Sequence, residues 1–386
     1  MSQLLILIFT GLFNFFPLIL LKMGVPEDKI ILSFSVFYFV NFLMLFFSRK
    51  LFFNNSNNFL LILMISFSTL LILYLLHINV IFILLATAIV FVIKDFINVN
   101  FYSKISDIST KENLNSQNII ATSLLIMMLI SALFNPVIGS LFDLNLKYGI
   151  TLTLFMSFFI TYILIKNKPN TVIKKTTLNK LTLSRRTHFH CILSFLYNST
   201  SFFCFFFIVP SSIYKIARQF GFDENTFKIM GLILGVSALF SIANFNKIKI
   251  ESFKLLFINY FLGIFCWVLI ALTYYFFENE TIKNNYILGF LFIIPFLTVQ
   301  VSSKLWSAGF IDYLKNIVNN EHKESNQLEA HKQSLSLFMI YKTLGGFYGF
   351  FIAFIFSNSL DYSYVVFINS TIAFLYGFFY FSKKYI

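Results

Sequence analysis

Long apolar stretches separated by short polar segments run along the whole chain. A bilayer core about 30 Å thick needs about 20 apolar residues in helical form. Windows of that length predict twelve membrane-spanning helices, at residues 3–21, 30–48, 59–76, 79–101, 117–140, 148–165, 191–213, 229–245, 253–277, 285–311, 334–357 and 363–382. The pattern therefore predicts an all-α membrane protein whose fourth and tenth helices continue past the bilayer.

The two halves of the chain are in register around a pair of lysines. Lys94 in the fourth span and Lys304 in the tenth are separated by about 210 residues. Each is followed, about 45 residues later, by a glycine in the next span, Gly139 or Gly349. This spacing indicates a duplicated chain with a site between its halves, as secondary transporters have.

A second echo of the repeat lies at the end of the first span of each half. Gly24–Glu27 is matched by Gly221–Glu224 at a slightly shorter offset. Because each half has an even number of spans, the halves form two parallel six-helix repeats related by an axis along the membrane normal. We expect three parts: an N-terminal six-helix half at 1–165, a basic cytoplasmic linker at 166–190 and a C-terminal six-helix half at 191–386.

The composition agrees with a polytopic membrane protein. Of the 386 residues, 58% are hydrophobic and 12% are charged, whereas a soluble domain is about 25% charged. The three cysteines, Cys191, Cys204 and Cys266, lie in apolar surroundings and form no CxxC pair. They are typical of small core residues rather than of a disulfide or metal framework.

Cations are distributed unevenly between the two sets of loops. The net charge is +13, and most lysines and arginines follow even-numbered spans, among them Lys50, Lys104, Lys175 and Arg185. Because cytoplasmic loops carry the excess of cations, both termini are predicted in the cytoplasm. We expect a multi-pass protein of the cytoplasmic (inner) membrane, monomeric, with the lipid bilayer and a small-molecule substrate as partners and no nucleic acid.

Four ionisable residues lie well inside predicted spans: Lys94, Asp95, Lys304 and Lys342. A charge in hydrocarbon costs about 3 kcal/mol on insertion scales, so such groups usually face a protein interior or a water-filled cavity. Asn98 and Gln300 share a helix face with Lys94 and Lys304 respectively, one turn away.

These residues predict a substrate site of net positive character, suited to carboxylate, phosphate or phenolate groups. Asp95 would pair with a lysine or carry a coupling proton. The alternative is that Lys94 and Lys304, counted along their helices, snorkel or pin a cytoplasmic gate. For Lys342 the same two roles are open.

Further polar and small residues interrupt the apolar spans. Asn14, Asn41 and Asn198 would bind a solute or form interhelical hydrogen bonds. Small residues allow helices to approach closely, and a proline loosens the hydrogen-bond ladder. A gating and helix-packing contact between the halves is therefore predicted at Pro136, Gly139, Gly345, Gly346 and Gly349.

The chain shows no signature of an enzyme or an ATP-driven pump. No glycine-rich phosphate loop, nucleophile elbow or HExxH helix is present. His188 and His190 form the closest histidine pair, without a set of acidic or cysteine partners, so no metal site is predicted. We expect no cofactor, with coupling to a proton gradient as an option.

The segment from Tyr102 to Asp143 resembles the major facilitator superfamily, nearest its macrolide- and siderophore-exporter-like branch. A short "KExLNxxN" turn leads there into a helix ending in P-x-x-G. The matching residues here are Lys111, Glu112, Leu114, Asn115, Asn118, Pro136 and Gly139. The loop after the second span departs from the family's G-x-x-x-D-R-x-G-R motif and keeps only Arg49 and Lys50.

The resemblance implies that spans one, four, seven and ten line a central cavity. It also implies a secondary active transporter that works by alternating access, with efflux of a drug- or siderophore-like solute as the first expectation. Uptake of an organic anion or nutrient is the alternative. A membrane-embedded transferase and a sensor without transport activity are remoter ones.

Overall fold

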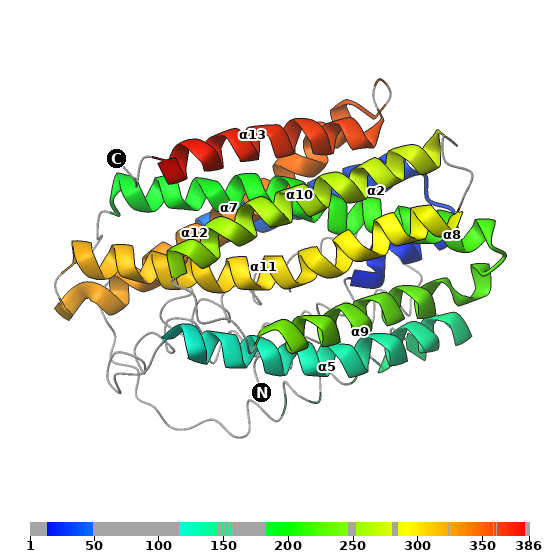
Figure 1. Cartoon of the computed structure of the whole chain (residues 1–386), viewed down its shortest axis with the longest axis horizontal. Helices are drawn as coiled ribbons and strands as arrows, with labels where there is room; N and C mark the ends of the chain where they lie inside the picture. Colours follow the sequence, from blue (N-terminus) through cyan, green and yellow to red (C-terminus); the bar gives the residue numbers. More distant parts are fainter. Residues whose placement is uncertain are drawn as a thin grey trace.

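The computed structural model is a bundle of long helices that lie roughly along one common axis (Figure 1). It describes residues 14–48, 116–145, 183–245, 252–279, 285–322, 324–357 and 361–382, and isolated residues between 148 and 162 and at 359. Residues 14–22 are helical. The named elements are α2 (Glu27–Ser48), α5 (Ser116–Leu144), α7 (Arg185–Phe203), η1 (Cys204–Ile208), α8 (Val209–Gln219), η2 (Asp223–Asn225), α9 (Thr226–Phe245), α10 (Ser252–Glu278), α11 (Asn285–Glu321), α12 (Glu324–Ile355) and α13 (Tyr362–Ser382).

The helices follow the predicted spans wherever the structure describes them. By length and apolar composition, six stretches of the described residues suffice to cross a membrane. The predicted spans at 59–76 and 79–101 lie outside the described residues, so twelve spans remain a prediction. As expected for the tenth span, α11 continues to Glu321.

The helix that begins the predicted second half starts earlier than the apolar pattern suggests. α7 begins at Arg185, inside the range predicted for the linker. Ser184 caps it, because its hydroxyl accepts a hydrogen bond from the backbone N–H of Thr187 at 3.2 Å. A capping serine satisfies a donor that the helix leaves unpaired, so the helix extends into a polar segment.

The span that α7 begins is interrupted by one turn of π-helix. In η1 the backbone N–H of Val209 bonds to the carbonyl of Cys204, the i→i−5 pattern of a π turn. Pro210 follows directly, and its ring supplies no N–H to the preceding turn. The span from Arg185 to Gln219 is therefore built from two α-helices joined at a local irregularity.

Two helix ends repeat the same hydrogen-bonded turn. Gly24 and Gly221 both have φ of 73°. The N–H of Gly24 bonds to the carbonyl of Leu21, and the next N–H, from Val25, bonds to Leu20. Gly221 and Phe222 make the same two bonds to Arg218 and Ala217. Both are Schellman turns. The similarity between Gly24–Glu27 and Gly221–Glu224 in the sequence therefore reflects the same turn at the end of two helices.

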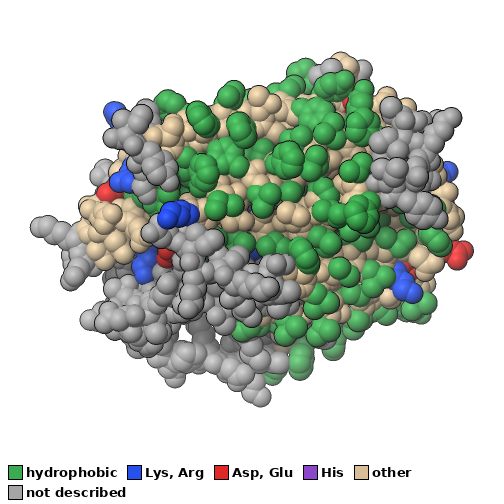
Figure 2. Space-filling view, viewed as in Figure 1, with side chains coloured by type: hydrophobic (Ala, Val, Ile, Leu, Met, Phe, Trp, Pro, Cys, Tyr) green, Lys and Arg blue, Asp and Glu red, His purple; other side chains and the backbone are tan. Residues whose placement is uncertain are grey.

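The surface of the bundle is apolar in its middle and charged at its two ends (Figure 2). Large apolar side chains such as Phe46 (56% exposed) and Phe378 (64% exposed) face outward. Continuous exposed apolar area is rare on soluble monomers, but lipid tails solvate it. We name the ends after their elements: the α8 end carries α8 and the start of α11, and the linker end carries the start of α7 and the end of α11.

Glycines let several pairs of described helices come close together. A Cβ added at Gly139 would collide with the carbonyl of Phe227, which brings α5 directly against the start of α9. A Cβ at Gly349 would collide with the carbonyl of Ser199 in α7. Small residues allow this approach between membrane helices.

We predict that Gly221→Ala lowers the free energy of unfolding by about 1 kcal/mol. A Cβ at Gly221 meets no atom within 4 Å, so the cost comes from the left-handed backbone alone. Gly289→Ala is the matched control, because a Cβ there also has open space while the helical backbone favours alanine. Thermal unfolding of the purified protein in detergent measures both, and equal midpoints for the two variants would contradict the prediction.

Candidate functional site

Lys304 of α11 and Lys342 of α12 lie close enough for their charges to repel each other. Both side chains are partly buried. Within the described part of the chain, no carboxylate forms an ion pair with either lysine. Each lies well inside its helix, about 22 Å from Gly289 and about 20 Å from Ile355 at 1.5 Å per residue. Two cations therefore share one neighbourhood between apolar helices, and no acid among the described residues pairs with them.

An aromatic wall borders the second lysine. The Nζ of Lys342 lies 5.6 Å from the centroid of the Phe202 ring in α7, within the range of a cation–π interaction. The Phe202 ring stacks on Tyr38 of α2 at 5.2 Å. Gly346, one turn beyond Lys342, lies against both rings. Three helices thus meet at this lysine.

The same rings belong to a larger group that we call the aromatic seam: Phe34, Tyr38, Phe202, Phe206 and Phe350. Its ring centroids lie 5.3 Å apart for Phe34 and Phe350, and 5.7 Å apart for Tyr38 and Phe350. Phe34 also stacks on Phe206 at 6.1 Å. Since α2 belongs to the predicted first half and the other helices to the second, the seam is a contact between the two predicted halves.

The remaining predicted polar residues differ in their surroundings. Asn198 is buried, and its amide donates to the carbonyl of Ser194 at 2.7 Å and to the Ser194 hydroxyl at 3.1 Å. Its donors are therefore used within α7. Gln300 is partly buried, one turn from Lys304. The buried Oδ1 of Asn14 has no hydrogen-bond partner among the described residues. Lys94, Asp95 and Asn98 lie outside the described residues.

The predicted gating and packing residues divide into two groups. Gly139 and Pro136 of α5 pack against α9, Pro136 by touching Gly231 and Gly235, and Gly346 packs against Tyr38. These three contacts join the predicted halves. Gly345 and Gly349 instead pack against the α7 backbone, so both lie in a contact within the predicted second half.

Asp143 is a functional candidate that sequence reasoning missed. Its carboxylate accepts hydrogen bonds from the backbone N–H groups of Phe227 (3.2 Å) and Lys228 (2.6 Å) at the start of α9. It also pairs with Lys22 at 3.3 Å and is only 9% exposed. A carboxylate at a helix N-terminus satisfies unpaired donors and matches the helix dipole.

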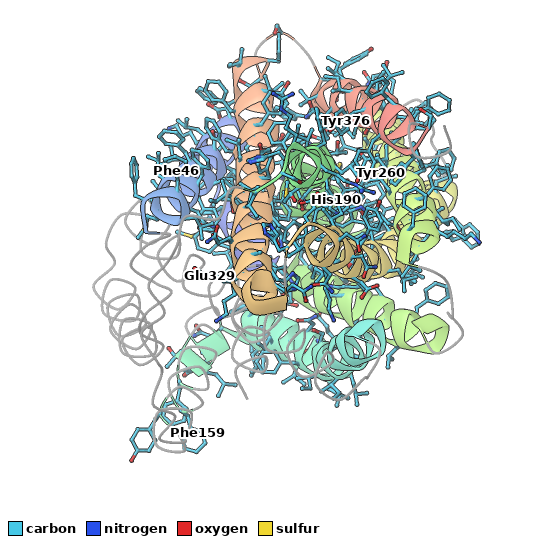
Figure 3. The ribbon with its side chains drawn as sticks, turned by 90° about the vertical axis from the view of Figure 1, so that its left-hand side faces the viewer. Phe46, Phe159, His190, Tyr260, Glu329 and Tyr376 are labelled. Atoms are coloured by element: carbon cyan, nitrogen blue, oxygen red, sulfur yellow. The ribbon has the colours of Figure 1, made fainter. Side chains whose placement is uncertain are left out.

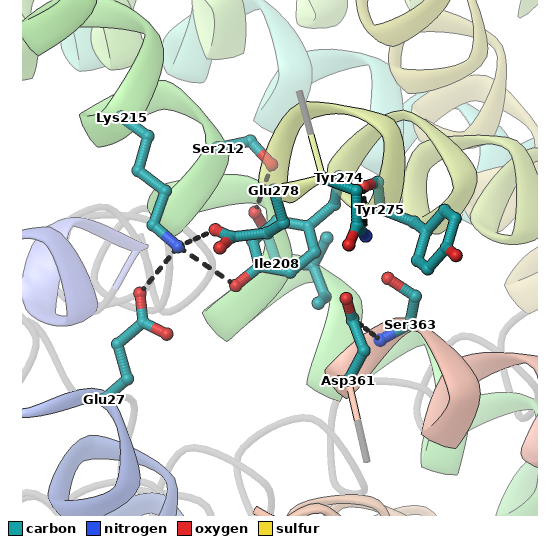
Figure 4. A network of polar contacts seen from close by, with 10 residues as sticks. Glu27, Ile208, Ser212, Lys215, Tyr274, Tyr275, Glu278, Asp361 and Ser363 are labelled. Carbon is teal, nitrogen blue, oxygen red and sulfur yellow. Dashed lines mark hydrogen bonds and ion pairs between the residues drawn. The ribbon is translucent and has the colours of Figure 1, made fainter. Parts of the chain in front are cut away.

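Lys215 makes a second cross-connection at the α8 end (Figure 4). Its Nζ pairs with Glu27 at 3.1 Å, with Glu278, and with the Tyr274 hydroxyl at 3.2 Å. Glu27 comes from α2, whereas Glu278 and Tyr274 come from α10. We call Lys22, Asp143, Glu27, Lys215 and Glu278 together the polar clasp.

The polar clasp ties the predicted halves together at the α8 end. The sequence shows its members as isolated loop charges, and nothing in their spacing reveals which loops meet. The pairing could have been suggested only by charges of opposite sign on loops that are predicted on the same side of the membrane. The Gly24 and Gly221 turns lie beside these loops.

The histidine pair of the sequence is bound to tyrosines. His188 Nδ1 lies 3.4 Å from the Tyr341 hydroxyl, and His190 Nδ1 lies 3.0 Å from the Tyr380 hydroxyl. Within the described residues, no group of three or more His, Cys, Asp or Glu side chains is placed to hold a metal ion. The three cysteines are buried, and they form no disulfide with one another.

Comparison with known proteins identifies the fold but no family. No family model and no curated protein matches the sequence. A bacterial homologue of the iron transporter ferroportin in its outward-facing state is similar in structure, with a TM-score of 0.63, 14% identity and coverage of 100% of this chain and 98% of that one. The inward-facing structure of such a homologue has a TM-score of 0.56 and 14% identity, and the match covers 99% of this chain and 97% of that one.

A variant of the nucleoside transporter NupG is also similar, with a TM-score of 0.59, 10% identity and 99% coverage of both chains. At these identities the likeness establishes the fold, which is that of major facilitator-type transporters. These neighbours are transporters and not enzymes, in agreement with the prediction from the sequence. None of them is described as a macrolide or siderophore exporter, so that branch stays a prediction.

We predict that Asp143→Ala lowers the free energy of unfolding by about 1–2 kcal/mol, the usual cost of losing a helix cap. Lys22→Gln should cost about 1 kcal/mol, because it removes a partly exposed ion pair and a cation–π contact with the Phe227 ring at 4.7 Å. Asp223→Ala removes an exposed acid at the same end and is the control. Thermal unfolding in detergent ranks the three, and a Lys22 variant as damaging as the Asp143 variant would assign the role to the ion pair instead.

Proposed function

We propose that the protein is a secondary active transporter that moves a small organic solute, anionic or amphiphilic, by alternating access. The observation that carries this proposal is the lysine pair, Lys304 and Lys342, inside two apolar helices. Intramembrane charges are expensive and usually mark a solute or ion path. A fold shared with transporters supports the same function.

The charge of the pair indicates the chemistry of the solute. Two cations that repel each other gain most from a ligand that carries negative charge between them. Carboxylate, phosphate and phenolate groups would accept charge-assisted hydrogen bonds from both ammonium groups. The Phe202 and Tyr38 rings beside Lys342 offer an apolar surface for the rest of an amphiphilic solute.

A gate at the lysines is the competing role, and the described contacts favour solute binding. A gate made of cations closes on anionic partners, and no described carboxylate forms an ion pair with Lys304 or Lys342. Lys94 and Asp95, the corresponding residues of the other predicted half, lie outside the described residues. We therefore propose the solute role for the lysine pair.

The contacts between the predicted halves suit a rocking motion. Apart from the Asp143 cap, the aromatic seam and the α5–α9 contact are made of rings and small residues, which would slide past each other without breaking hydrogen bonds. The polar clasp adds directed bonds at the α8 end. Partly exposed ion pairs of this kind are each worth about 1 kcal/mol or less, so the clasp would open at modest cost.

The substrates named for the neighbours differ in how well they match this site. The ferroportin homologue is described as a relative of an iron transporter, but a bare metal cation would be repelled by Lys304 and Lys342. NupG is described as a nucleoside transporter, and a nucleobase would stack on the aromatic wall. An organic solute with an anionic group satisfies both the lysines and the rings.

Direction, coupling and membrane placement belong to the proposal as well. Efflux follows from the resemblance to the exporter-like branch, and uptake of an organic anion or nutrient is the alternative. We place the protein in the cytoplasmic membrane with both termini in the cytoplasm, as a monomer coupled to a proton gradient. Asp95, the candidate coupling residue, lies outside the described residues.

Comparative metabolite profiling of cells and spent medium, with and without the protein, tests the function. A compound retained inside the deletion strain would identify an exported solute, and a compound left in the medium would identify an imported one. Identical profiles under all growth conditions would contradict transport.

With that compound as the probe, we predict that Lys304→Gln and Lys342→Gln each reduce transport about 10- to 100-fold. Losing a hydrogen bond to a charged group costs about 1.5–3 kcal/mol, and about 1.4 kcal/mol corresponds to a factor of ten. Lys254→Gln, at an exposed lysine of α10, is the control. Full transport by the double lysine variant at normal membrane levels would remove the site.

A further inference from the structure

An open pocket of about 410 Å³ lies at the linker end, between α7, α11 and α13. Its polar lining comes from Arg185, Arg186, Tyr313, Tyr376 and Tyr380. Figure 3 looks onto this end and labels Tyr376 on α13 and His190 on α7. The pocket is separate from the lysine pair, which the proposed function uses.

The pocket is basic and its rings are fixed in position. Tyr376 donates a hydrogen bond to the carbonyl of Phe189 at 2.9 Å, and the Tyr380 hydroxyl bonds to His190 at 3.0 Å. The Nη2 of Arg186 donates to the Tyr313 hydroxyl at 3.3 Å. These bonds hold the wall still and leave most donors of the Arg186 guanidinium available.

The two arginines are not neutralised in the described structure. Arg185 is exposed and has no described partner. Glu321 lies near enough to Arg186 to offset part of its charge, but the two form no ion pair among the described residues. Two adjacent guanidinium groups on one pocket are suited to bidentate recognition of a phosphate.

The mouth of the pocket continues into an apolar surface. Phe189 and Phe379 complete its lining and are 53% and 55% exposed. Along α13, the side chains of Ile368, Ile372, Leu375 and Phe379 are all exposed. Their spacing places them on one face of the helix, which runs from the middle of the bundle to the pocket.

We propose that this pocket binds the phosphate headgroup of an anionic phospholipid, with the acyl chains lying along the exposed face of α13. A phosphodiester would bind Arg185 and Arg186, and its glycerol would lie among the tyrosines. A free phosphate ester has the same charge but gains nothing from Phe379 and the α13 face. The continuity of charged pocket and apolar face therefore selects the lipid. The predicted cytoplasmic side of the linker end is also where anionic lipids concentrate.

Native mass spectrometry of the purified full-length protein in a neutral detergent tests the site. The titrants are phosphatidylglycerol and phosphatidylcholine with identical acyl chains. We expect the first phosphatidylglycerol molecule to bind at least about tenfold more tightly than the first phosphatidylcholine molecule. Arg185→Gln should weaken it about fivefold, and the double variant Arg185→Gln/Arg186→Gln about 25-fold, because each surface cation contributes about 1 kcal/mol.

The double variant Arg218→Gln/Lys228→Gln is the matched control, since it removes two exposed cations at the α8 end and should bind as the unchanged protein does. Equal weakening in that control, or an unchanged preference in both arginine variants, would overturn the site. Arg185→Gln keeps the test valid if Arg186→Gln impairs folding, because Arg185 has no described partner to lose.

A third titration distinguishes lipid from free phosphate. Glycerol 1-phosphate should not displace the lipid at concentrations up to about a thousandfold excess. Displacement at a concentration similar to that of the lipid would assign the pocket to a soluble phosphate ester and overturn the lipid assignment.

Discussion

Hydrocarbon offers no partner to a polar group, and this constraint governs the structure at every level. Backbone groups must bond within their own segment, so each spanning segment is a helix. Side chains that face lipid are apolar, as the exposed phenylalanines of α2 and α13 are. Charges gather at the two ends, where water and headgroups solvate them (Figure 2). Lys304 and Lys342 depart from that rule, which is why they have the strongest claim to a function.

The same constraint changes what holds helices together. Apolar burial gives little preference for protein over lipid, so contact depends on close fit and on the few polar bonds available. Gly139 against Phe227 and Gly349 against Ser199 provide the fit. Asp143 and Lys215 provide the polar bonds at the α8 end. Between these, the aromatic seam fills the contact of the predicted halves with flat rings. Such a contact is dense but carries no fixed hydrogen-bond register.

The sequence predicted what depends on local pattern. Apolar runs located the described helices, and the glycine echo at Gly24 and Gly221 marked a turn that the structure repeats. The early start of α7 was not predicted, because the apolar window does not register a capping serine such as Ser184. The proximity of Lys304 to Lys342, and of Asp143 to Phe227, arises from packing between helices. Distances between residues that are far apart in the chain cannot be predicted from the local pattern of a single sequence. For the same reason, the sequence did not predict that the Asn198 amide donates its hydrogen bonds within its own helix.

The two cationic sites differ less in chemistry than in access. The Lys304–Lys342 pair lies inside apolar helices and is bordered by Phe202 and Tyr38, so an anion reaches it only between helices. Arg185 and Arg186 lie at the end of the bundle, on a pocket that opens onto the α13 face, so an anion reaches them from the membrane surface. A cation at depth recovers its desolvation cost only when a solute arrives, which suits a transient ligand. A cation at the surface loses little hydration, so a lipid that is always present can occupy it. Depth therefore separates the solute site that we propose from the lipid site that we propose.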